Sequence, residues 1–183
     1  MIVCSRGPLI HLQMDIKPEY ATEIDWRPAW SAGAPCPRVF SNGHKTYLVY
    51  YVEEPDPNWD GSYTKMIDPS SEDVYTMAVV EFLHPHSHRF GIVNDEAANG
   101  HPLYEKGLEV YAAHKIENSS WVAELKAIHK VHPYFSELKW LKYNHYLLFF
   151  HDEIFEIIAS GYEIQLYKST FRELAIMIAE FLN

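Results

Sequence analysis

Runs of apolar residues bounded by turn residues predict most of the elements of this chain. Residues 46–53 read T-Y-L-V-Y-Y-V-E, and both sets of alternating positions are apolar. We therefore expect a strand that is covered on both faces and lies centrally in a sheet. Asn42-Gly43 favours a hairpin turn between residues 38–41 and this strand. Three further runs predict strands: residues 74–83, 88–93 and 108–116.

The second of these three runs should return antiparallel to the first, because only a short proline-containing turn separates them. The third run also suits a helix. A helix over residues 119–131 is predicted by Ser119 or Ser120, either of which can cap it. Its apolar positions have helical spacing: Trp121, Leu125 and Ile128. A helical turn should follow at residues 136–142, after Pro133 ends the first helix.

Three short strands and a final helix complete the predicted order. Residues 144–150, 154–159 and 162–167 are separated by turn residues and predict a β-meander. Thr170 and Glu173 have the spacing of a capping box, which opens the last helix. The apolar stripe of this helix should pack on the sheet and bury Phe171, Leu174 and Ile178.

These elements predict one α+β domain over residues 1–183, with a mostly antiparallel β-sheet, two or three helices, and the C-terminal helix packed on the sheet. Prolines interrupt residues 1–45, which should be irregular and wrap the core apart from a short strand at 9–16. Residues 55–72 have the composition of a long loop.

The charge balance restricts the classes of partner that this chain is expected to bind. The 183 residues include 15 lysines and arginines against 25 aspartates and glutamates, so the net charge is −10 with neutral histidines. Such a chain should be repelled by nucleic acids and by anionic membranes. The N-terminus lacks the pattern of a secretory signal, and Cys4 and Cys36 form no C-x-x-C pair, which favours a cytoplasmic protein with free thiols.

A candidate metal site lies at His84, His86 and His88. On an extended backbone these alternate positions point to one face, so three imidazoles could bind Zn²⁺ or another divalent metal. The alternative is a solvated polar turn, because Pro85 and the histidines suit an exposed connection between strands.

A second candidate site lies at the turn formed by His151, Asp152 and Glu153. A carboxylate beside an imidazole raises the pKa of the imidazole toward the range of a general base, and a turn at a strand end can present both groups to a cleft. The alternative is an ordinary polar hairpin turn. His145 shares a strand face with apolar residues and should be a core histidine with one hydrogen bond, while Glu156 lies on the neighbouring strand.

The loop over residues 94–108 brings Asp95, Glu96 and His101 within reach of one another, and Glu96 is a further candidate catalytic residue. An ordered Ω-type connection is the structural alternative. Together with Asn118-Ser119-Ser120-Trp121 and Phe150-His151-Asp152, this loop resembles an uncharacterised family of bacterial proteins with no assigned activity. The resemblance covers roughly residues 44–167. It implies a small, soluble bacterial domain and assigns no catalytic residue.

Two classes of function remain. The first, which we favour, is a non-enzymatic protein-interaction domain of the immunity or antitoxin type, which needs no cofactor and binds a partner with a basic surface. The second is a small metal-assisted hydrolase that uses the histidine cluster, with Asp95, Glu96 or Asp152 accepting a proton from the metal-bound water. Nucleotide-binding glycine loops and the G-x-S-x-G motif are absent from the sequence.

Overall fold

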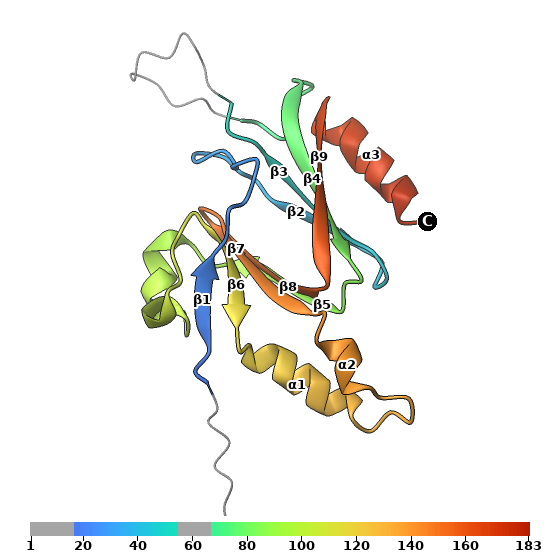
Figure 1. Ribbon diagram of the computed structural model, residues 1–183. Coiled ribbons are helices and arrows are strands. Elements are labelled where there is room, and N and C mark those ends of the chain that lie inside the picture. Colours follow the sequence, from blue (N-terminus) through green and yellow to red (C-terminus); the bar gives the residue numbers. More distant parts are fainter. Residues whose placement is uncertain (1–16, 55–66) are drawn as a thin grey trace, which may run out of the picture.

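Two antiparallel β-sheets packed face to face form the centre of the computed structural model, which describes residues 17–54 and 67–183 (Figure 1). One sheet has five strands, in the order β1 (Tyr20–Glu23), β6 (Ala113–Glu117), β7 (Asn144–Phe149), β8 (Glu153–Ala159) and β5 (Ser87–Ile92). The other has four, in the order β2 (Arg38–Ser41), β3 (Thr46–Tyr51), β4 (Tyr75–Leu83) and β9 (Gly161–Ser169). The predicted strand at 9–16, Cys4 and most of the loop at 55–72 lie outside the described residues.

The core between the sheets is built from alternate positions of the central strands, because every second side chain of a strand points to the same face. All six residues of β3 are buried, as the apolar pattern on both of its faces predicts. Trp26 and Trp30, from the irregular segment before β2, add two indole rings to this core. Its largest aromatic side chains come from both sheets: Tyr50, Phe82, Phe150 and Phe155.

Each sheet also has a covered outer face. Helix α3 (Phe171–Phe181) lies on the four-stranded sheet, where it buries Leu174 and Ile178 as predicted but leaves Phe171 only partly buried. The capping box of Thr170 and Glu173 is formed as predicted. The short helices η1 (Asp95–Gly100) and η2 (Tyr104–Lys106) cover part of the five-stranded sheet. The α+β class, the mostly antiparallel sheets and the packing of the C-terminal helix are thereby confirmed.

The predicted pairing is wrong at two of the connections between the sheets, from β4 to β5 and from β8 to β9. β5 does not return along β4 but pairs with β8, because His84 takes a left-handed conformation with φ of 49° and turns the chain into the other sheet. β9 leaves β8 and pairs with β4, so the predicted meander has only two strands in one sheet. The strand expected from residue 108 begins only at Ala113, after a left-handed residue at Tyr111.

Two helices follow β6 and form a projecting unit, residues 120–142, which we call the helical hairpin (Figure 1). Its first helix, α1 (Ser120–His129), is capped by Ser119, and its second, α2 (Glu137–Trp140), is a single turn. Trp121 and Trp140 attach it to the body of the protein. Among the described residues, no helix is long and apolar enough to cross a membrane.

Candidate functional site

The structure does not bring the three histidines of the predicted metal site together. The Nδ1 atom of His84 lies 2.9 Å from Oγ of Ser160. His88 is an exposed residue of β5 whose ring stacks on Phe155, with ring centroids 6.2 Å apart, and partial desolvation lowers its pKa. The left-handed backbone at His84 breaks the alternation on which the prediction depended. In the part of the chain that the structure describes, no three His, Cys, Asp or Glu side chains are placed to hold a metal ion.

His86 belongs to an aromatic cluster at the base of the helical hairpin. Its ring centroid lies 4.8 Å from that of His129 and 4.9 Å from that of Trp140. Burial, and secondarily the charge of His129, lowers the pKa of His86, so the neutral form is favoured. His86 is therefore a packing residue between the sheet and the hairpin.

The second predicted site is partly assembled. Nδ1 of His151 lies 2.9 Å from Oδ1 of Asp152, and this contact raises the pKa of His151. Tyr111 packs against His151 and donates a hydrogen bond to Asp95, which lowers the pKa of that carboxyl group. Both members of the His151–Asp152 pair are exposed, and Glu96 is exposed on η1. These groups form a polar, acidic rim at one end of the sandwich.

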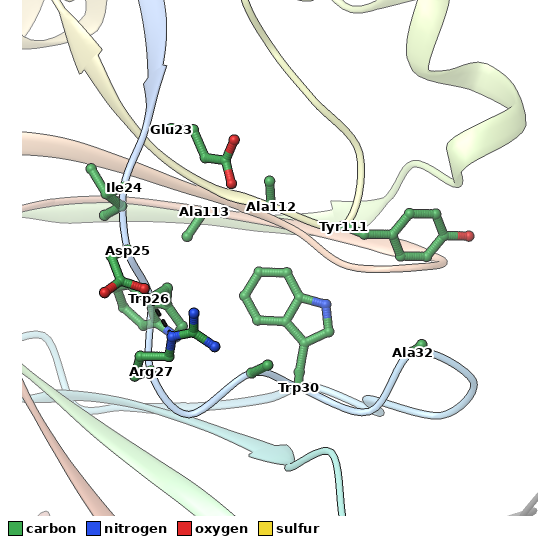
Figure 2. A pocket seen from close by; sticks show the side chains of 11 residues that line it. Glu23, Ile24, Asp25, Trp26, Arg27, Trp30, Ala32, Tyr111, Ala112 and Ala113 are labelled. Carbon is green, nitrogen blue, oxygen red and sulfur yellow. Dashed lines mark hydrogen bonds and ion pairs between the residues drawn. The ribbon is translucent and has the colours of Figure 1, made fainter.

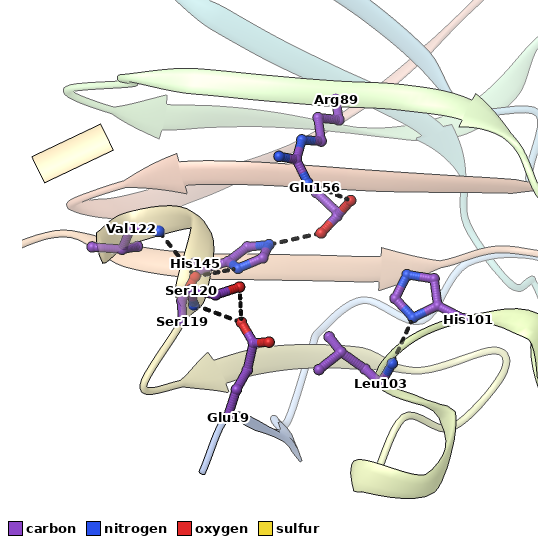
Figure 3. Close-up of polar contacts among 9 residues, drawn as sticks. All are labelled: Glu19, Arg89, His101, Leu103, Ser119, Ser120, Val122, His145 and Glu156. Atoms are coloured by element: carbon purple, nitrogen blue, oxygen red, sulfur yellow. Dashed lines mark hydrogen bonds and ion pairs between the residues drawn. The ribbon is translucent and has the colours of Figure 1, made fainter. Parts of the chain in front are cut away.

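A buried polar array on the outer face of the five-stranded sheet was not predicted (Figure 3). His145 on β7 and Glu156 on β8 lie diagonally across the strand pair, with His145 Nε2 2.9 Å from Glu156 Oε2. Nδ1 of His145 is 2.9 Å from Oγ of Ser119. A carboxylate only accepts hydrogen bonds, so in neutral His145 the Nε2–H donates to Glu156 and Nδ1 accepts from the hydroxyl of Ser119.

Cationic and aromatic groups surround this array. The guanidinium of Arg89 lies 3.9 Å from the ring centroid of Trp121, and one of its nitrogens is 4.0 Å from Glu156. Burial alone would raise the pKa of Glu156, but the hydrogen bond and charge of His145, with Arg89 and His101, lower it. Glu156 is therefore held as a carboxylate inside the array.

The array joins a hydroxyl, an imidazole and a carboxylate in the order found in a nucleophile triad. Its surroundings indicate a structural role instead. Ser119 is only 8% exposed, and its Oγ also accepts the backbone N–H of Val122 as the cap of α1. The array thus fixes the start of the helical hairpin to β7 and β8. The sequence signal was available: a turn at residues 151–152 places positions 145 and 156 diagonally on one face.

An open pocket of about 490 Å³ lies between residues 23–32 and residues 111–113 (Figure 2). The largely buried indole of Trp30 lines it from the core side, and Glu23, Asp25 and Tyr111 are exposed residues of its lining (Figure 2). Nε of Arg27 lies 2.9 Å from Asp25 at the surface. The two segments are distant in sequence, so no local pattern could have indicated this pocket.

Charge and apolar surface are distributed unevenly over the molecule. The helical hairpin contains four lysines and two glutamates, a net charge of +2, so the rest of the chain, whose total is −10, carries −12. Five large apolar side chains of the hairpin region are exposed, at fractions from 57% to 90%: Ile128, Val131, Tyr134, Leu138 and Leu141. The hairpin is therefore a basic, apolar projection from an acidic body.

Comparisons with family models, with curated proteins and with solved structures found no match to this chain. The resemblance to an uncharacterised bacterial family accordingly stays a prediction. The described residues thus contain four candidate sites: the open pocket, the acidic rim, the buried array and the helical hairpin.

Proposed function

We propose that this chain is a non-enzymatic protein-interaction domain, of the immunity or antitoxin type, which binds a partner with a basic surface at the open pocket around Trp30. The observation that carries the proposal is the combination of carboxylates and aromatic rings in one pocket. Glu23 and Asp25 offer negative charge, the exposed ring of Tyr111 offers an apolar face, and the largely buried Trp30 lines the pocket from the core.

An arginine or lysine side chain of the partner matches this lining. Its alkyl stem can lie on the exposed ring of Tyr111. Its charge is attracted by the ring face, which is worth about 0.5–2 kcal/mol depending on desolvation. The carboxylate of Glu23 can then accept hydrogen bonds from the cationic end. Arg27 already makes such a pair with Asp25 from within the chain, at 2.9 Å.

The charge of the body supports the same partner. A charge of −12 outside the hairpin attracts a basic protein before contact and raises the rate of association. A metal-assisted hydrolase has less support, because His84, His86 and His88 contact separate partners. A cytoplasmic location is part of the proposal and agrees with the free thiol of Cys36.

The double substitution Glu23→Gln and Asp25→Asn tests the pocket. We expect the variant to bind a hexa-arginine peptide roughly tenfold more weakly than the parent, equivalent to about 1.4 kcal/mol. Isothermal titration calorimetry at about 50 mM salt measures this, and binding by the parent should weaken at about 500 mM because salt screens the charges.

The matched control is Glu105→Gln with Glu180→Gln, which changes the net charge equally at exposed positions on η2 and α3. It should bind the peptide within about twofold of the parent, since long-range charge alone contributes little to affinity. Equal weakening in both double variants would mean that net charge alone is recognised and that the pocket is no binding site.

A further inference from the structure

The helical hairpin has the features of a docking element without a partner. Of the fourteen large apolar side chains exposed in the described residues, five lie between positions 128 and 141. Val131, Tyr134, Leu138 and Leu141 are each at least 77% exposed. Clustered apolar side chains of this kind mark interaction surfaces more often than scattered ones do.

The chemistry of the hairpin is complementary to that of the open pocket. Lysines flank the apolar side chains at positions 126, 130, 139 and 142, and the first two of them pair with Glu137 of the hairpin at 3.2 and 3.8 Å. The pocket offers the carboxylates of Glu23 and Asp25 for such lysines and the exposed ring of Tyr111 for the apolar groups.

The pocket cannot receive the hairpin of its own chain. Strand β6 begins at Ala113, which lines the pocket, and ends at Glu117, two residues before the cap of α1. The pocket and the hairpin therefore lie toward opposite ends of the five-stranded sheet (Figure 1). Only a second molecule can bring these two surfaces into contact.

We propose that a second copy of this chain is a partner of the pocket, with the helical hairpin of one copy docked on the pocket of the next. This inference rests on the proposed function, because it names an occupant for the same pocket. The contact uses different surfaces on the two copies, so it is head-to-tail, and successive copies can add at either end. The lysines face the carboxylates, and the exposed leucines and Tyr134 face the ring of Tyr111.

Sedimentation velocity on the full chain tests the proposal. We expect the weight-average mass of the parent to rise with concentration above the 21.3 kDa of one chain, and to rise less at high salt. Leu138→Ser with Leu141→Ser removes the hairpin surface, and Glu23→Gln with Asp25→Asn weakens the pocket. Each double variant alone should associate at least roughly tenfold more weakly than the parent, since one of its two surfaces is impaired.

Mixing the two double variants gives the decisive result. One intact pocket and one intact hairpin remain between them, so the mixture should form a one-to-one dimer of about twice the monomer mass and stop there. Circular dichroism checks that both variants are folded, which is expected because the substituted side chains are exposed. The control Glu105→Gln with Glu180→Gln should associate like the parent.

Three outcomes would overturn the inference: a parent that stays monomeric at the highest soluble concentration, a mixture that fails to dimerise, or a control that also loses association. Binding of the monomeric parent to vesicles of phosphatidylserine and phosphatidylcholine through Leu138 and Leu141 would assign the hairpin to lipid instead. Peptide binding distinguishes the two proposals. If hexa-arginine still binds at the pocket while the parent never associates, the self-docking inference fails and the proposed function stands.

Discussion

Replacing Leu174 with alanine should lower the free energy of unfolding by about 2–5 kcal/mol. Leu174 is 2% exposed and lies on the face of α3 that packs against the four-stranded sheet. Its neighbours there include Val49 and Met77, which are themselves almost fully buried. The smaller side chain loses the transfer free energy of the deleted atoms and leaves a cavity that the rigid sheet cannot close. Denaturant unfolding followed by circular dichroism measures the change.

Ile176→Ala is the matched control on the same helix. Ile176 is 57% exposed, so its replacement should change the unfolding free energy by no more than about 0.5 kcal/mol. If Leu174→Ala unfolds at the same denaturant concentration as the parent, α3 contributes nothing to stability and its packing on the sheet is not required for folding.

His145→Leu should destabilise the protein by about 3–5 kcal/mol, because it leaves the carboxylate of Glu156 largely buried and without its strongest hydrogen-bond donor. The side chain of Glu156 is only 14% exposed, so water cannot fully replace the lost partner. The variant also removes the acceptor of the Ser119 hydroxyl at the start of α1. Chemical denaturation of the parent and the variant at neutral pH gives the difference.

The double variant His145→Leu with Glu156→Leu distinguishes the loss of the attractive His145–Glu156 interaction from the cost of leaving the Glu156 carboxylate buried and unpaired. Once the charge is gone, no buried carboxylate remains unsatisfied, so the double variant should recover much of the stability. Should it instead be less stable than His145→Leu alone, the array would stabilise the fold through its attractive interactions and not through the avoidance of an unpaired charge.

Acid should weaken the same array. The pKa of Glu156 is lower in the folded protein than in the unfolded chain, where a glutamate titrates near about 4.3. The stabilising contribution is therefore complete above the unfolded value and is lost as the pH falls through the folded value. Glu156→Gln should flatten this acid limb of stability against pH. An acid limb of unchanged steepness in the variant would show that other carboxyl groups cause it.

Those features of the fold that depend only on residues close in sequence could be predicted. The capping box at Thr170 needs only Glu173, three residues later, and the hairpin signalled by Asn42-Gly43 needs only the four loop residues between the paired Ser41 and Thr46. The strand at 46–53 was placed centrally because both of its faces are apolar. Each of these depends on backbone conformations and side-chain periods within a few residues.

Partners distant in sequence could not be predicted in the same way. β5 and β4 are joined by a short turn, yet they lie in different sheets, because the choice between them depends on packing over the whole core and on one left-handed residue at His84. His84, His86 and His88 share one face only if the backbone is extended over all three residues. The pocket around Trp30 needs Tyr111 from a segment far along the chain, which no spacing rule connects to it.

The junction of β8 and β9 has a consequence for how the molecule unfolds. β8 ends at Ala159 in one sheet and β9 begins at Gly161 in the other, so a single residue, Ser160, separates them. Its amide and hydroxyl both bond to the carbonyl of Leu83, which holds the end of β4 at the same corner. Because of these bonds, neither sheet can separate from the core without displacing the strand end of the other sheet at this corner. The two layers should thus behave as one cooperative unit, with the slowest-exchanging amides of both opening only in global unfolding.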